Sequence, residues 1–351
     1  MRRESPMPRP VDPMDTKLAS NDAAGSRTGP AWKAWAGISR WRELGVVAAA
    51  VAIGLFFALL APSFLTPYNL FNLLRQTSEL GIVAMAMTIL IVSGEFDLSV
   101  GAIYAVTGVV TALAYKTGGW PIGLAAIAGM VVALGLGWLN GLLVTKARMT
   151  SFIATLATMM VFRGLAMVLT QGQPISGFPS LAFLEVLGHA KLFGSLPVPV
   201  VWLAVAGLLL YVLLHRTAYG LRVFATGDNR RAAELAGIRT SRLKQWNFLI
   251  TAGAAGFASL ISLGYLKTVT PTQGTGLELE AIAAAVIGGT AMRGGAGSIL
   301  GAFLGALIMA EVRTGLVLIG TGAYVQDACV GLIIALAVML NLRLTARSAA
   351  D

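Results

Sequence analysis

The charged side chains inside the apolar part of the chain have the most capacity for chemistry. Glu95 and Asp97 stand where an apolar segment begins, and Arg163 stands in the middle of another. An ionised group inside a bilayer is costly unless it is paired or hydrated. We therefore expect Arg163 to face Glu95, Asp97 or backbone carbonyls, or to lie along a path for a solute. An acidic residue at the position of Asp97 can also cap a helix N-terminus.

No motif for covalent or hydrolytic chemistry accompanies these charges. The sequence contains no Gly-Lys pair, and therefore no phosphate-binding loop of the Gly-x-x-x-x-Gly-Lys-Ser/Thr type. His189 and His215 lack zinc-binding spacing, and a Gly-x-Ser-x-Gly turn is absent from the sequence. The single cysteine, Cys329, cannot form an intrachain disulfide. The sequence predicts no catalytic residue, no metal, no cofactor and no ATP hydrolysis by the chain itself.

The composition places these residues in a membrane protein. Of the 351 residues, 56% are hydrophobic and 12% are charged, whereas soluble proteins carry about 25% charged residues. Apolar stretches suited to a ~30 Å hydrocarbon layer recur from Leu44 to Leu344. The formal charge of +10 comes largely from basic residues between these stretches, where it indicates topology rather than nucleic-acid binding. We expect an all-α protein of the bacterial inner membrane, with the lipid bilayer and not nucleic acid as a partner.

The apolar stretches predict about ten transmembrane helices. With a cytoplasmic N-terminus, most of the 26 Lys and Arg residues fall on the cytoplasmic side, so both termini are predicted to be cytoplasmic. Residues 1–43 are polar and contain several prolines without any period, which predicts a disordered tail. The transmembrane domain then covers residues 44–345, and a short tail covers residues 346–351. The predicted spans are 44–61, 80–93, 98–115, 120–144, 151–171, 198–214, 246–267, 281–292, 296–312 and 323–342.

Two of these spans are short and stand at corresponding places in the two halves of the chain. The apolar cores at 81–92 and 281–292 are each about 18 Å long at 1.5 Å per residue, too short to cross unaided. Gly94 and Gly294 lie in the turns that follow them. Short segments interrupted by glycine in two related halves indicate a transport path. Tight packing of small residues is the other interpretation.

The longest predicted cytoplasmic loop after the tail is 215–245. Asp228 or Asn229 can cap a short helix that runs through Glu234, and Gly237 can end it in the left-handed conformation. Such a helix, held between two spans, is a suitable lever for a partner protein. A solvated loop whose arginines only fix the topology is the alternative.

Four segments resemble, in register, the permeases of ribose, xylose and galactose type ABC importers. The stretch SGEFDLSVG at 93–101 is similar to that family's Ser-Gly-x-x-Asp-Leu-Ser-Val-Gly motif, although the family usually has Gly-Ile or a similar pair in place of Glu95-Phe96. This departure leaves the substrate open. The other matches are SFIATL at 151–156 with Arg163-Gly164, the loop residues 225–238, and the stretch 276–290.

The resemblance implies a homodimer with the pathway between protomers, a cytoplasmic ABC ATPase subunit on the 215–245 loop, and a periplasmic solute-binding protein. It favours the lever interpretation of that loop. The ATPase-coupling residues that it indicates are Gly227, Asp228, Asn229, Arg230, Glu234 and Gly237. The candidates for the translocation path or gate are Glu95, Asp97, Ser99, Thr107, Arg163, Gly288, Gly289 and Thr290.

The function that we expect is therefore a permease subunit of an ATP-driven importer, which translocates a sugar or polyol and performs no covalent chemistry. An ion-coupled secondary transporter is the main alternative from another class, and it would need an intramembrane carboxylate such as Glu95, Asp97 or Asp327. Within the importer class, a branched-chain amino acid or an autoinducer remains an alternative cargo.

Overall fold

The structure is a computed structural model, and it describes residues 31–348. The predicted tail residues 1–30 and residues 349–351 lie outside the described part. The chain divides into two compact units, residues 1–42 and 43–351. Helix α1 (Ala31–Leu60) begins in the first unit, well before the predicted start at Leu44, so residues 31–43 of the predicted tail are helical. All that follows concerns the second unit.

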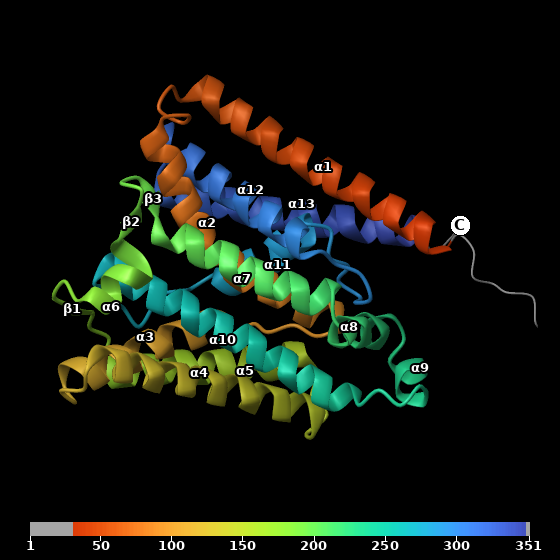
Figure 1. Cartoon of the computed structure of the whole chain (residues 1–351), viewed down its shortest axis with the longest axis horizontal. Helices are drawn as coiled ribbons and strands as arrows, with labels where there is room; N and C mark the ends of the chain where they lie inside the picture. Colours follow the sequence, from red (N-terminus) through yellow and green to blue (C-terminus); the bar gives the residue numbers. More distant parts are fainter. Residues whose placement is uncertain (1–30, 349–351) are drawn as a thin grey trace, which may run out of the picture. The chain divides into compact units, whose positions relative to one another are not determined.

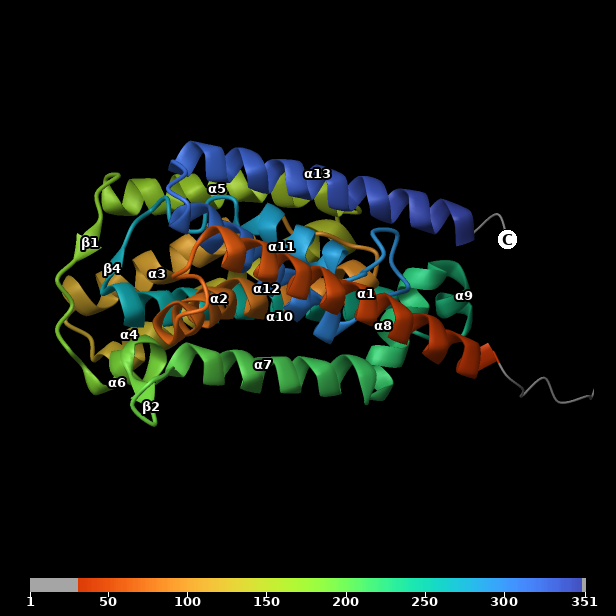
Figure 2. The ribbon, with the colours of Figure 1, turned by 90° about the horizontal axis from the view of Figure 1, so that it is seen from above.

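The second unit is built almost entirely from helices (Figures 1 and 2). Six helices among the described residues are long and apolar enough to cross a membrane, and three apolar stretches are shorter, at Leu44–Leu60, Val100–Lys116 and Tyr324–Leu336. The long elements are α2 (Pro67–Val92), α3 (Val100–Lys116), α4 (Ile122–Thr145), α5 (Ser151–Thr170), α7 (Val198–His215), α10 (Thr240–Leu266), α12 (Ile299–Leu318) and α13 (Ala323–Ser348). The short ones are α6 (Ala182–Leu184), a single π-helical turn at Glu185–His189, α8 (Ala218–Asp228), α9 (Arg230–Leu235) and α11 (Leu277–Ile287).

Two small strand pairs tie the connections together at one end of the helices. Strand β1 (Ile175–Ser176) pairs antiparallel with β4 (Thr268–Val269), and Ile175 lies opposite Val269. Strand β2 (Lys191–Leu192) pairs antiparallel with β3 (Leu196–Pro197). The sequence predicted only polar connections here.

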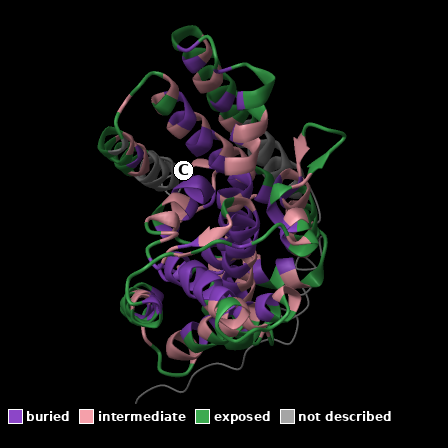
Figure 3. Ribbon diagram, turned by 90° about the vertical axis from the view of Figure 1, so that its left-hand side faces the viewer, coloured by how far each residue is buried: buried purple, intermediate pink, exposed green. Residues whose placement is uncertain are grey.

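Helix α2 is the centre of the fold. It packs against α7, α10, α11 and α12, and 83% of its most apolar window is buried inside the protein. A second layer forms where α3 and α4 pack against α10, with α4 and α10 side by side (Figure 1). Buried residues concentrate in the interior (Figure 3). Helices α4, α5 and α7 expose much of their apolar surface.

The prediction of a short span at 80–93 is wrong, because α2 begins at Pro67 and has 26 residues. The Thr66 side chain caps this start by accepting a hydrogen bond from Asn69, and proline is well suited to the first helical position. Polar residues in the first turns lower the hydropathy there, so hydropathy alone did not predict that the helix begins at Pro67. At the other short segment, predicted at 281–292, the structure has the 11-residue helix α11, which begins at Leu277 and ends at Ile287.

Small residues allow α11 and α12 to approach backbone to backbone. A Cβ placed on Gly301 would lie 2.0 Å from the Gly288 carbonyl oxygen, and one on Gly305 would lie 2.0 Å from the Ala284 carbonyl oxygen. Side-chain atoms cannot occupy such positions, so glycine is required. The packing interpretation of these glycines therefore holds for α12.

Replacing Gly301 by Ala should lower the stability of the purified protein by about 1–3 kcal/mol, because the added methyl group forces α11 and α12 apart. Gly135→Ala is the matched control, since nothing lies within 4 Å of its Cβ position on α4. Thermal unfolding in detergent compares the two variants. Equal midpoints would show that the contact between α11 and α12 is not tight.

Candidate functional site

Glycines from three parts of the chain meet at one place in the structure. Gly94 follows α2, Gly227 is near the end of α8, and Gly294 and Gly295 follow α11; we call these four residues the glycine junction. The Gly295 amide donates to the carbonyl of Val92 at 2.9 Å. A Cβ on Gly227 would lie 1.7 Å from the same carbonyl oxygen, and one on Gly294 would lie 3.1 Å from the Gly94 nitrogen.

The glycine junction joins the 215–245 loop to the turns after both α2 and α11. Because its contacts are between backbones, no flexible side chain can absorb a displacement. A shift of α8 must therefore move the Val92 carbonyl and the turn at Gly294 and Gly295. Of the residues predicted to form the coupling loop, Gly227 has the closest contact with the helical core.

The loop itself contains two helices rather than the single one predicted. Helices α8 and α9 lie beyond the ends of α7 and α10 (Figure 1). Asn229 caps α9 by accepting a hydrogen bond from Ala232 at 3.0 Å, and Gly237 has a φ of 83° where α9 ends, as the sequence indicated. Thr217 caps α8, which the sequence analysis missed.

Polar contacts hold the end of the loop rigid. The Thr240 hydroxyl donates to the Glu234 carboxylate at 2.6 Å, and Arg230 pairs with the same carboxylate at 2.9 Å. These two hydrogen bonds, with Thr240 first, lower the pKa of Glu234. Asp228 is exposed, as are Asn229 and Arg230, so this surface is accessible for a partner.

A buried ion pair links α10 to the segment between α2 and α3. Lys244 and Glu95 are 2.5 Å apart, with 8% and 12% of their side-chain surfaces exposed. Lys244 is on the second turn of α10, at the end of the 215–245 loop, and Glu95 adjoins Gly94. A buried pair of this kind is costly to break on one side only. Glu95 is therefore a link between the loop and the membrane segment.

Asp97 lies at the centre of a buried polar network. Its Oδ1 accepts hydrogen bonds from the Ser99 amide at 2.8 Å and the Ser99 hydroxyl at 2.7 Å. Asn140 of α4 donates to the Ser99 hydroxyl at 2.7 Å, and Thr158 of α5 donates to Asn140 at 2.7 Å. Asp97, Ser99 and Asn140 are fully buried. The network fixes the turn before α3 against α4 and α5. Asp97 accepts from the amide of Ser99, which is itself the N-cap of α3, so Asp97 is not the capping residue that the sequence predicted.

Side chains of α5 satisfy the extended backbone that leads to this turn. The Ser151 hydroxyl accepts from the Phe96 amide at 3.2 Å, and the Thr155 hydroxyl accepts from the Leu98 amide at 3.0 Å. Irregular backbone at membrane depth requires partners of this kind.

Arg163 stabilises a second irregular segment, the connection 267–276 between α10 and α11. Its guanidinium donates to the carbonyls of Pro271 and Gln273 at 2.9 and 2.8 Å. Of the alternatives given by the sequence, backbone carbonyls are thus its partners. The neighbouring segment also approaches α3 closely, since a Cβ on Gly101 would lie 2.1 Å from the Gly274 carbonyl oxygen and 2.4 Å from Glu278.

The remaining path candidates lie in packed positions. The Thr107 hydroxyl donates to the Ile103 carbonyl at 2.7 Å inside α3, and Thr107 is fully buried where Gly129 of α4 packs against it. Gly288 contacts Gly301, and Gly289 turns the chain with a φ of 90°. Thr290 is fully buried. Of the path candidates, the structure brings Asp97 and Ser99 into direct contact.

Sequence reasoning missed several residues of this arrangement. Asn140 and Thr158 could have been found as polar side chains within apolar helices, which usually face the interior of a bundle. Lys244 carried no such signal, because a basic residue beside a span reads as a topology marker. The pair of Glu280 on α11 with Arg313 on α12 also has no signal in the local sequence.

Buried, interrupted helices linked to an exposed loop define a membrane transport subunit, and comparisons with known proteins agree. Residues 69–340 match the family described as "Branched-chain amino acid transport system / permease component". The chain belongs to this family of importer permeases and is a multi-pass protein of the inner membrane.

Curated relatives cover nearly the whole chain. It is 40% identical over 300 residues to the ribose import permease protein RbsC of Bacillus subtilis, covering 86% of this chain and 92% of the relative. It is 37% identical to the ribose import permease protein RbsC of Escherichia coli K12, covering 80% and 88%. It is 34% identical to the xylose transport system permease protein XylH of the same strain, covering 84% and 90%. No solved structure matches.

Removing one member of the buried pair, by Glu95→Gln or Lys244→Met, should destabilise the protein by about 3–5 kcal/mol, because a charge is left buried without its partner. The double variant should recover most of this loss. Thermal unfolding of the three variants tests the coupling. The exposed pair Arg230 and Glu234 serves as control, with a much smaller coupling because solvent screens its charges. Additive losses for Glu95 and Lys244 would mean that the two charges do not interact.

Proposed function

We propose that this chain is the membrane-spanning permease subunit of an ATP-driven importer for a sugar or polyol. The names of the relatives support ribose or a similar pentose as the class of cargo. The chain carries no ATPase motif, so a partner ABC ATPase hydrolyses ATP. A periplasmic binding protein delivers the solute and supplies most of the specificity.

The observation that carries the proposal is the glycine junction. An ATPase dimer that closes on ATP presses on α8 and α9, and the contact of Gly227 with the Val92 carbonyl passes this movement to α2. Because the Gly295 amide is hydrogen-bonded to the Val92 carbonyl, the turn after α11 moves together with the end of α2. Both interrupted segments then shift as rigid bodies between inward-open and outward-open states. Gly227, Asp228, Asn229, Arg230, Glu234 and Gly237 form the proposed coupling surface.

The proposed topology has ten spans with both termini in the cytoplasm. It comprises α1 to α5, α7 and α10 to α13, in two related halves. Residues 44–345 form the permease domain, the 215–245 loop faces the ATPase, and residues 1–43 and 346–351 are cytoplasmic. The shortness of α11 is compatible with this count, because the connection 267–276 enters the membrane beside Arg163 and covers the remaining depth.

The proposed assembly is a homodimer with the pathway between two copies. Helix α5 supports this arrangement: it exposes Ile153, Met160 and Val168, yet its half-buried Arg163 holds polar backbone close to the same surface. A charged residue on an otherwise apolar exposed helix suits a hydrated passage better than lipid. Asp97, Ser99 and Arg163 are the proposed path or gate residues; Glu95 acts as a link, and Thr107, Gly288, Gly289 and Thr290 act through packing.

An ion-coupled transporter is less well supported. Glu95 is paired with Lys244, and Asp97 is occupied by Ser99, so neither carboxylate is free to bind an ion. Asp327 is exposed on α13.

Vanadate-sensitive uptake tests the proposed function directly. The chain is purified from its native membrane in mild detergent, co-purifying proteins are identified by mass spectrometry, and uptake of labelled ribose and xylose is measured in proteoliposomes. We expect a co-purifying ATPase and uptake that orthovanadate abolishes. Uptake by the chain alone that resists vanadate and stops when the ion gradient is dissipated would instead establish a secondary transporter.

Gly227→Ala should reduce ATP-driven uptake at least tenfold, about 1.4 kcal/mol or more in coupling, because its methyl group displaces the Val92 carbonyl. The ATPase should still co-purify, since Gly227 is half-buried and the exposed coupling residues are intact. Gly135→Ala is again the control, with uptake unchanged. Normal uptake by the Gly227 variant would exclude the glycine junction as the transmission point.

A further inference from the structure

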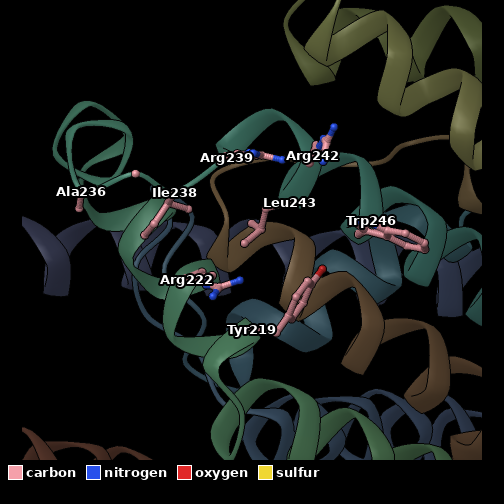
Figure 4. Close-up of a pocket in the computed structure, with 9 residues that line it drawn as sticks. Tyr219, Arg222, Ala236, Ile238, Arg239, Arg242, Leu243 and Trp246 are labelled. Atoms are coloured by element: carbon pink, nitrogen blue, oxygen red, sulfur yellow. The ribbon is translucent and has the colours of Figure 1, made fainter.

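A pocket of about 770 Å³ opens between α8 and the first turns of α10. Tyr219 and Arg222 line it from α8, and Arg239, Arg242 and Trp246 line it from the other side (Figure 4). All three arginines are exposed. Among the described residues, their guanidinium groups have no ion pair or hydrogen bond, so their charges are available for a ligand.

No carboxylate neutralises this pocket from its own walls. Between Ala218 and Leu266 the chain has only two acidic residues, Asp228 and Glu234. Neither lines the pocket, and Glu234 is bound to Arg230 and Thr240. The pocket therefore has a net positive charge and suits an anion. Planar guanidinium groups bind the oxygens of a phosphate especially well.

The position of the pocket identifies the source of the anion. Arg242 and Trp246 are one turn apart on α10, which is long and apolar enough to span the membrane. The Trp246 indole is 60% exposed, and exposed tryptophan at the end of a span is typical of the headgroup layer. A pocket whose wall is the first two turns of a span lies at the level of phospholipid headgroups.

Apolar surface suited to acyl chains is exposed on the helix that precedes α8. Helix α7, which leads into α8, exposes Leu208 by 64% and Leu209 by 65%. Tyr219 closes the inner side of the pocket: its hydroxyl is 2.5 Å from Asn247, to which it donates a hydrogen bond, and burial raises its pKa well above the ordinary value, so it stays a neutral donor.

We propose that this pocket binds the phosphate headgroup of an anionic glycerophospholipid, with Arg222, Arg239 and Arg242 as its cationic ligands and Trp246 against the glycerol region. The site lies at the inner end of the 215–245 loop, and Gly237 of the proposed coupling surface also lines it, but it does not depend on what the protein transports. A surface of the partner ATPase is the competing occupant. The lipid is favoured because the pocket extends to the exposed Trp246 at the end of a membrane-spanning helix.

The test measures lipid binding to the full-length chain by native mass spectrometry in detergent. The pocket variant Arg222→Gln/Arg239→Gln/Arg242→Gln is compared with Lys146→Gln/Arg148→Gln/Arg231→Gln, which removes the same charge from exposed residues outside the pocket. The probes are phosphatidylglycerol, phosphatidylcholine and soluble glycerol phosphate. Thermal unfolding confirms that each variant is folded, as expected for changes at exposed side chains.

We expect one saturable phosphatidylglycerol per chain, bound at least about tenfold more weakly by the pocket variant and unchanged in the control. Trp246→Ala should weaken the same binding. Equal losses of phosphatidylglycerol binding in both triple variants would mean that binding depends on the net charge of the protein and not on the pocket. Glycerol phosphate that binds as tightly as the lipid would show that the pocket is a site for soluble anions. Loss of the co-purifying ATPase with unchanged lipid binding would assign the pocket to the partner; each of these three results overturns the proposal.

Discussion

The structure depends on satisfying backbone groups where helices are interrupted inside the protein. Hydrocarbon offers no hydrogen-bond partner, so irregular backbone at membrane depth must be covered by other protein groups. Amides of the segment between α2 and α3 donate hydrogen bonds to the Ser151 and Thr155 hydroxyls. Carbonyls of the connection before α11 accept hydrogen bonds from Arg163. Helix α5 supplies all three side chains. It therefore supports both interruptions, although it is among the more exposed helices.

This constraint explains why glycine and buried charge occur together. An interrupted segment can cross a bundle only where neighbouring backbones approach closely, as at Gly101 and Gly274 or at Gly227 and Val92. Such contacts fix distances but have little cohesive energy of their own. The buried pair of Lys244 and Glu95 adds a directional link beside the glycine junction. Together they connect the 215–245 loop with the interrupted segments, as the proposed coupling to a partner ATPase requires.

Much of the membrane character and part of the site could be predicted from sequence. The apolar stretches, the cap at Asn229, the left-handed Gly237 and the shortness of α11 follow from local rules that depend only on neighbouring residues. The start of α2 could not be predicted in this way, because its polar first turns are stabilised by contacts such as that of Asn69 with the Phe64 carbonyl at 2.8 Å. Of the two helices in the 215–245 loop, the sequence predicted α9 but not α8.

The partner of each charged residue was harder still to predict. Glu95 and Lys244, for example, are 149 positions apart, and such a pair leaves no pattern in the local sequence. Hydropathy treats every basic residue near a span alike, yet this chain uses them in three ways. Arg163 donates hydrogen bonds to backbone carbonyls, and Lys244 neutralises a buried carboxylate. The arginines around Trp246 have no protein partner among the described residues. Burial separates these cases: a cation that the protein surrounds must find its counter-charge within the chain, whereas an exposed cluster beside an interfacial tryptophan can find it in the bilayer.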